Sequence, residues 1–206
     1  KLSKSALSEP LTTFMQNSHF GPDCPDQAQY RHLIHEAYFF LLQIPRLAIL
    51  MNAVAASRFF KIVFDFKREF VDFLDPSTEP YTNGLCYLSG RIYIGAVGML
   101  DPNRFHEVVG VIAHELCHYA MFLVYGNLAR PYKAKDLERK EVFKKISNDC
   151  KAVKDSEDKV ASVFDDYPRS MRHAELIVRP PQMMAQYHKN QEKLEERVKT
   201  FPTLFN

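Results

Sequence analysis

The pattern of hydrophobic and polar positions divides the chain into helix-like and strand-like segments. Residues 27–44 predict a helix that Asp26 can cap, and Pro45 kinks or restarts it through Ala56. Residues 1–25 are rich in proline and predict a loosely structured N-terminal segment with one short helix near 11–17. On the helix after Asp26, His32 and Glu36 share a face by their i,i+4 spacing, and we interpret them as ordinary helix-surface residues.

Between residues 59 and 95 the pattern changes to the alternation that is typical of strands. Phe60, Ile62 and Phe64 fall on one side of a predicted strand over 59–67. A polar loop follows, and residues 85–88 and 91–95 flank a Ser89-Gly90 turn, which predicts a hairpin. The hairpin favours a small, mainly antiparallel sheet.

A long helix follows the predicted hairpin. Asp101 and Pro102 are a capping residue and a first helical residue, apolar residues continue to about Tyr125, and Gly126 is a C-terminal stop. These signals predict one regular helix over 102–125.

The last third of the chain is predicted to be helical. Residues 127–159 are a charged connector, with helices expected near 136–148 and 157–164. Another helix is expected over 169–178, and Pro180-Pro181 should break or offset it before a charged helix over 182–200. The predicted class is therefore α+β, in one domain over residues 1–206. Residues 26–125 would form the first helices, the sheet and the long helix, and 126–206 a helical part.

The candidate chemistry lies on the long helix, in the sequence His114-Glu115-Leu116-Cys117-His118. Histidines four residues apart lie on one helix face, so their imidazoles can bind the same ion. Zn²⁺ accepts imidazole nitrogen and leaves one position for water at catalytic sites. Glu115 projects about 100° around the helix from His114, where it can accept a proton from the activated water without binding the metal.

The segment 111–119, Val-Ile-Ala-His-Glu-Leu-Cys-His-Tyr, resembles the zincin metallopeptidases. The resemblance covers about half the chain, because residues 59–95 followed by 102–125 match the zincin order of sheet and active-site helix. It implies a zinc cofactor, hydrolysis of peptide bonds, and pairing of an extended substrate with a strand, for which we consider residues 91–96.

The third metal ligand distinguishes the zincin subfamilies. Met121 and Val124 replace the glycine and histidine that a metzincin has after its HExxH motif, and no histidine follows His118 before His173, which argues against an SprT-like protease. In a gluzincin a glutamate on a later helix is the third ligand. Glu175, a lone acid beside an apolar run, is the best candidate, with His173 second and Glu138 and Glu141 after it.

A zinc peptidase also needs a donor that stabilises the oxyanion. His173 and Tyr187 are the preferred candidates, and Tyr167 and His188 remain alternatives. Arg179, one helical turn after Glu175, could orient that carboxylate, although surface pairing explains it equally well.

Composition and charge add little to this interpretation. A net charge of +2 gives no strong nucleic-acid signal, and no segment has the length of a membrane span. Four cysteines without a CxxC pair favour reduced thiols in an intracellular protein, cytoplasmic or nuclear. Because the chain begins Lys1-Leu2-Ser3, we expect it to be part of a longer protein.

The sequence therefore predicts a zinc-dependent endopeptidase that acts on a protein or peptide substrate. Its predicted ligands are His114, His118 and Glu175, and its predicted base is Glu115. The alternatives are an SprT-like protease acting on DNA-associated proteins, a zincin-fold module that binds a partner without cleaving it, and a metal-free helical domain.

Overall fold

The computed structural model describes residues 4–57, 59–66, 84–87, 89–125, 145, 148 and 172–200. This part contains six α-helices and a four-stranded sheet, in agreement with the predicted α+β class. Lys145 and Asn148 are helical, within the helix predicted near 136–148; the rest of that helix, the helix predicted near 157–164 and the predicted stop at Gly126 lie outside the described residues.

The N-terminal region is more regular than the sequence predicts. Helix α1 (Lys4–Asn17) includes Pro10, and the short strand β1 (Ser18–Phe20) follows it directly. The buried Ser18 hydroxyl bonds both the Phe14 carbonyl, at 2.7 Å, and the Tyr38 hydroxyl, at 2.7 Å. The prediction of a loosely structured segment was wrong for residues 4–20, because this region packs its Phe14 into the core.

Helices α2 (Gln27–Gln43) and α3 (Pro45–Ser57) follow the prediction closely. The Asp26 side chain accepts a hydrogen bond from the Gln29 backbone N–H at 3.0 Å, which is N-cap geometry. Pro45 opens α3, as predicted. None of the described helices is by itself long and apolar enough to cross a membrane; α2 and α3 together pass by length and composition but are bent by 117°.

The sheet is mixed, and most of its pairings are parallel. Its order is β1-β2-β4-β3, with β2 at Lys61–Asp65, β3 at Gly84–Cys86 and β4 at Arg91–Gly95. The β3–β4 hairpin is antiparallel, as predicted, but β1–β2 and β2–β4 are parallel. The prediction of a mainly antiparallel sheet was therefore wrong, because alternation along a strand does not reveal the direction of its neighbours.

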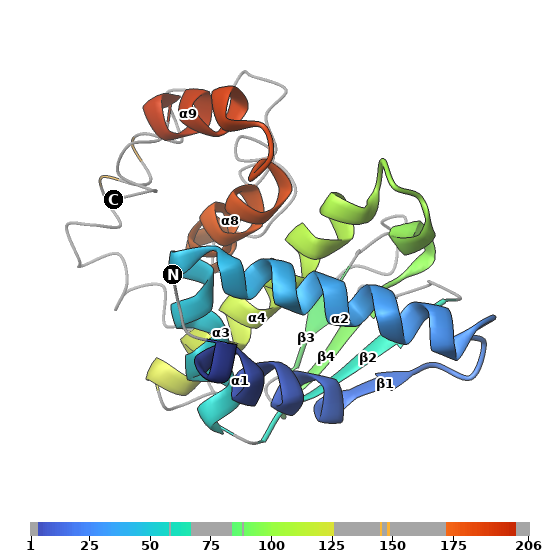
Figure 1. The fold of residues 1–206 in the computed structure, drawn as a ribbon. Helices are drawn as coiled ribbons and strands as arrows, with labels where there is room; N and C mark the ends of the chain where they lie inside the picture. The colour runs from blue at the N-terminus through green and yellow to red at the C-terminus, as the bar shows by residue number, and fades with distance from the viewer. Residues whose placement is uncertain are drawn as a thin grey trace, which may run out of the picture.

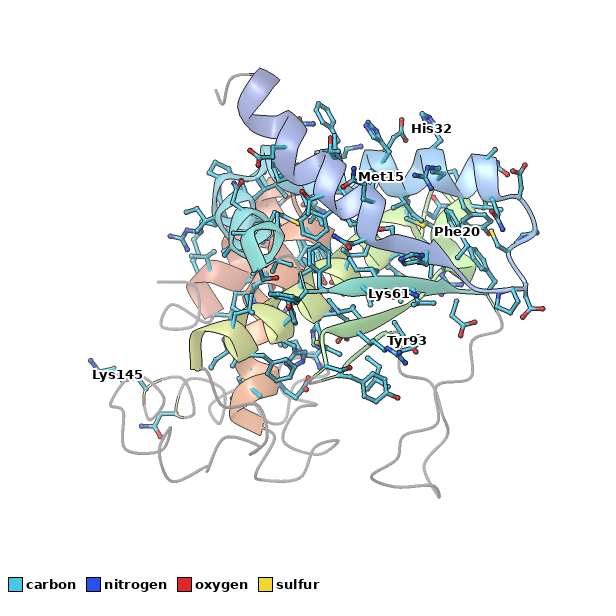
Figure 2. The ribbon with its side chains drawn as sticks, turned by 90° about the horizontal axis from the view of Figure 1, so that it is seen from below. Met15, Phe20, His32, Lys61, Tyr93 and Lys145 are labelled. Carbon is cyan, nitrogen blue, oxygen red and sulfur yellow. The ribbon has the colours of Figure 1, made fainter. Side chains whose placement is uncertain are left out.

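One face of the sheet forms the core with the helices. The register aligns Ile62 with Ile92 and Phe64 with Ile94, and all four side chains have no exposed surface. Gly84 and Cys86 are aligned with Ile94 and Ile92 and share this face. Figure 1 shows α2 running across the sheet, and Figure 2 shows Tyr93 on the sheet side turned away from α2.

Helix α4 (Phe105–Tyr125) is the central element of the described structure, after the short 3-10 helix η1 (Val97–Leu100). It packs against α3, β3 and β4, and it has its most extensive contact with α8 (Arg172–Gln186). The Asp101 carbonyl accepts a hydrogen bond from the Phe105 backbone N–H at 2.9 Å, and the Asp101 side chain accepts one from the Asn103 backbone N–H at 2.9 Å. The helix thus begins a few residues later than predicted, after a turn that Asp101 stabilises.

Helix α8 continues through Pro180 and Pro181, so the predicted break at these prolines was wrong. The interruption falls instead at 187–190, before α9 (Gln191–Thr200). Helix α8 runs antiparallel to α4, since Glu175 lies beside His118 and Gln186 lies beside Gly110. A Cβ on Gly110 would lie 2.4 Å from Cγ of Gln186, so glycine permits this close helix approach. Figure 1 shows α8 and α9 at the end of the molecule away from β1.

Candidate metal centre

The two histidines of the HExxH motif point to the same place between α4 and α8. Their Nε2 atoms are 3.2 Å apart, and the two rings meet edge to face with centroids 4.8 Å apart. The i,i+4 spacing accounts for this convergence, because it puts both rings on the α4 face that contacts α8. Both imidazoles are largely removed from solvent, with 11% and 13% of their side chains exposed.

Glu175 completes the group from the first turn of α8. Its Oε2 lies 3.5 Å from Nε2 of His114, and its Oε1 lies 3.3 Å from Nε2 of His118. The three ligand atoms of this His-His-Glu group all lie within 4.8 Å of one another, and the group could hold a metal ion. The predicted convergence of His114, His118 and Glu175 is thus confirmed.

The spacing of the three side chains fits a small divalent ion. Two ligands held at about 2.1 Å by a tetrahedral ion lie about 3.4 Å apart, because the tetrahedral angle fixes their separation. The two Nε2 atoms are 3.2 Å apart, and the nearest Glu175 oxygen to each lies at 3.3 Å (Oε1 to His118) and 3.5 Å (Oε2 to His114), so the three side chains surround a space of about this size. In addition, Oε2 of Glu175 is buried without a hydrogen-bond partner. A bound cation would satisfy this oxygen, which is otherwise costly to bury.

Gln182 fixes the protonation of His114. Its Oε1 accepts a hydrogen bond from an Nη atom of Arg179 at 2.9 Å and lies 3.1 Å from Nδ1 of His114. Because guanidinium can only donate, the shared Gln182 atom must be the carbonyl oxygen, and Nδ1 of His114 must carry the proton. Nε2 is then left with its lone pair directed at His118 and Glu175, which is the form that binds a metal.

Arg179 links this support to the third candidate ligand. Its second Nη atom lies 3.9 Å from Oε2 of Glu175, so the ion pair expected from their i,i+4 spacing is present, and with 12% of the Arg179 side chain exposed it is not a surface pair. Gln182 was not predicted. Its position one turn after Arg179 and two turns after Glu175 puts it on the same face of α8, and this spacing was the available signal.

Burial and neighbouring charges shift the pKa values of the three candidate ligands in different directions. Burial lowers the pKa of His114 to about 4, so this imidazole is neutral. Burial would also lower the pKa of His118, but the hydrogen bond and the charge of Glu175 raise it. Burial likewise opposes ionisation of Glu175, yet its contacts with the two histidines hold its pKa well below the ordinary range. Glu175 is therefore an anion in a buried site, as a metal ligand must be.

Glu115 lies beside the group without joining it. Its Oε1 is 3.9 Å from Nε2 of His114, and the residue is 5% exposed. Its position on the helix turns it toward β3, where Gly84 lies against its side chain. Burial raises the pKa of this carboxyl group to about 7. Glu115 can consequently take up and release a proton near neutral pH.

Of the other predicted site residues, Tyr187 and His188 are described, and neither joins the group. Tyr187 lies beyond the end of α8, about 18 Å along the helix axis from Glu175 at 1.5 Å per residue, and Lys193 Nζ lies 4.7 Å from its ring centroid. His188 packs against Phe40, with ring centroids 5.3 Å apart. His173 belongs to the first turn of α8, but its side chain lies outside the described residues, as do Glu138, Glu141 and Tyr167.

The strand considered for substrate pairing is not available for it. Residues 91–95 form β4, which is paired with β2 on one side and with β3 on the other. Within the described residues β3 is the strand of this hairpin that pairs on one side only, and it is also the strand beside Glu115. The sequence could not show this difference, since both strands of a hairpin have the same alternation.

The chain was compared with known proteins. No protein-family model, curated protein or solved structure matches it.

Proposed function

We propose that this chain is a zinc-dependent endopeptidase. The observation that carries the proposal is the buried convergence of His114, His118 and Glu175, with the Glu115 carboxyl group alongside. Two imidazoles and one carboxylate form a ligand set that suits zinc and leaves a fourth position for water. Gln182 and Arg179 favour the same conclusion, because they hold His114 in its metal-binding tautomer.

In the proposed reaction each residue has one task. When bound, zinc acts as a Lewis acid that polarises a water molecule and the substrate carbonyl. Glu115, buried beside the group, would accept a proton from that water and later return it to the leaving amine. His114, His118 and Glu175 hold their donor atoms in place throughout. An extended peptide could add to the outer edge of β3, which would bring its backbone next to Glu115.

The test compares two Glu→Gln variants on one helix. Glu115→Gln should retain zinc and fold but lose at least about 1,000-fold in the rate of cleavage of an unfolded protein such as casein, because the base is removed. Glu107→Gln is the matched control, since Glu107 lies on the same helix but is 58% exposed. The control should cleave at the wild-type rate.

Two results would overturn the proposal. In the first, Glu115→Gln cleaves as fast as wild type, so that Glu115 is not the base. In the second, zinc-loaded wild type cleaves neither casein nor a mixed peptide library, which would favour the partner-binding module. Repeating the assay with double-stranded DNA tests the SprT-like alternative, which requires DNA-stimulated cleavage.

A further inference from the structure

Strand β3 contacts the Glu115 side chain at a glycine, Gly84. A Cβ placed on Gly84 would lie 2.7 Å from Cγ, 2.7 Å from Oε1 and 2.9 Å from Cδ of Glu115. Real Cβ contacts of this length essentially do not occur, so Glu115 occupies the space that any other residue at position 84 would need.

The backbone conformation of Gly84 does not itself require glycine. Gly90, in the adjacent turn, is the glycine with a positive φ among the described residues, at 79°. Gly84 instead lies in a regular antiparallel pairing opposite Ile94. The requirement for glycine at position 84 is therefore steric, and alanine there tests the contact with Glu115 rather than backbone strain.

Glu115 has little room to move away from an added side chain. The residue is 5% exposed, and its Oε1 also lies 3.9 Å from Nε2 of His114. Cys86, two residues after Gly84, lies on the same face of β3 and packs against the core. The buried carboxylate thus lies in contact range of both the β3 backbone and His114.

We propose that Gly84 is a positioning residue, whose missing side chain leaves the slot that aims the Glu115 carboxylate at the His-His-Glu group. The catalytic consequence rests on the proposed peptidase activity, whereas the steric claim does not. A side chain at position 84 would displace the carboxylate, and a displacement of about 1 Å can reduce turnover about 100-fold.

The steric claim is tested by unfolding the metal-free protein. Gly84→Ala should lower the folding equilibrium constant about 10-fold in wild type, as overpacking of a buried site does. In a Glu115→Ala background the added methyl group enters vacated space, so the same substitution should cause no loss. Leu85→Ala is the control, because Leu85 lies on the opposite face of β3 and its effect should be equal in both backgrounds.

The positioning claim is tested on zinc-loaded protein. Gly84→Ala should bind one zinc with wild-type affinity, lose about 100-fold in kcat and leave KM nearly unchanged, because the metal ligands and the peptide-binding edge are intact. In a Glu115→Gln background Gly84→Ala should cause no further loss.

Each outcome decides one of the two claims. The steric claim is overturned if Gly84→Ala lowers the folding equilibrium constant equally in wild type and in Glu115→Ala. It is also overturned if the double variant Gly84→Ala/Glu115→Ala does not fold. If Gly84→Ala alone does not fold but that double variant does, the contact is supported. If the effect of Gly84→Ala on folding depends on Glu115 but the zinc-loaded wild type cleaves nothing, the peptidase proposal is refuted and the steric claim stands. Full activity of Gly84→Ala would refute positioning alone.

Discussion

Two histidine–glutamate pairs in this molecule have nearly the same separation and very different surroundings. On α2, Nε2 of His32 lies 3.4 Å from Glu36, within one helix face, and the two side chains are 71% and 54% exposed. Between α4 and α8, Nε2 of His118 lies 3.3 Å from Glu175, and those side chains are 13% and 7% exposed. Figure 2 shows His32 on the outer side of α2.

The comparison shows that burial and convergence, rather than residue type, distinguish a candidate site. An exposed pair exchanges its contact with water freely and contributes at most about 1 kcal/mol. Burying a carboxylate costs several kcal/mol unless partners compensate, and Oε2 of Glu175 has no hydrogen-bond partner. A buried anion facing two imidazoles from another helix forms a group that could hold a cation.

The two pairs should differ most in how removal of their glutamate changes the stabilisation of the protein by zinc. In wild type, free zinc at 1,000 times its dissociation constant should raise the free energy of unfolding by about 4 kcal/mol, because only the folded chain assembles the ligands. Glu175→Ala should lose most of this increment, whereas Glu36→Ala should keep it. Urea unfolding with buffered zinc and with EDTA measures this increment in each variant. Equal increments in Glu175→Ala and Glu36→Ala would show that Glu175 does not contribute to zinc binding.

A smaller effect should come from the support behind His114. Gln182→Ala leaves Nδ1 of His114 without its acceptor, so zinc affinity should fall about 10- to 100-fold, or about 1.4 to 2.7 kcal/mol. Gln186→Ala is the matched control, since Gln186 lies one turn further along α8 beside Gly110. Competition with a chromophoric chelator gives both dissociation constants. An unchanged constant in Gln182→Ala would mean that the hydrogen bond does not orient the ligand.

The smallest effect is expected at the exposed pair. Replacing His32, Glu36 or both with alanine should give a coupling free energy of about 0.3 to 0.5 kcal/mol, as for other i,i+4 pairs on helix surfaces. Zinc affinity should stay unchanged in all three variants. A double-mutant cycle in urea measures the coupling, and a value above about 2 kcal/mol would show that this pair has a role that its exposure conceals.

The parts of the fold that could be predicted are those that local chemistry determines. Asp26 caps α2 and Pro45 opens α3 where the sequence predicts them, because both effects act within one helical turn. The parallel pairing of β1 with β2 could not be predicted, since β1 is three residues long and its partner lies beyond two helices. Pro180 and Pro181 likewise remain helical because α8 packs along α4, and this tertiary contact outweighs their local preference.

The candidate site divides in the same way. His114 and His118 are set by helical spacing, and Glu175 could be selected because it is a lone acid beside apolar residues. Gln182 could be placed on the same helix face as Glu175 by its spacing, but its role, like that of Gly84, depends on which element faces it across the packed interface. Tyr187 was chosen for its chemistry alone, and the length of α8 keeps it away from the ligands.

X-ray absorption at the zinc edge of the loaded protein tests the central claim most directly. We expect one zinc per chain, bound by two imidazole nitrogens at about 2.0–2.1 Å and by oxygen, with no sulfur neighbour. The chain also has Cys24, Cys86 and Cys117 as free thiols among its described residues. A sulfur shell at about 2.3 Å, or protein that retains no zinc, would contradict the assignment of His114, His118 and Glu175 as the metal centre.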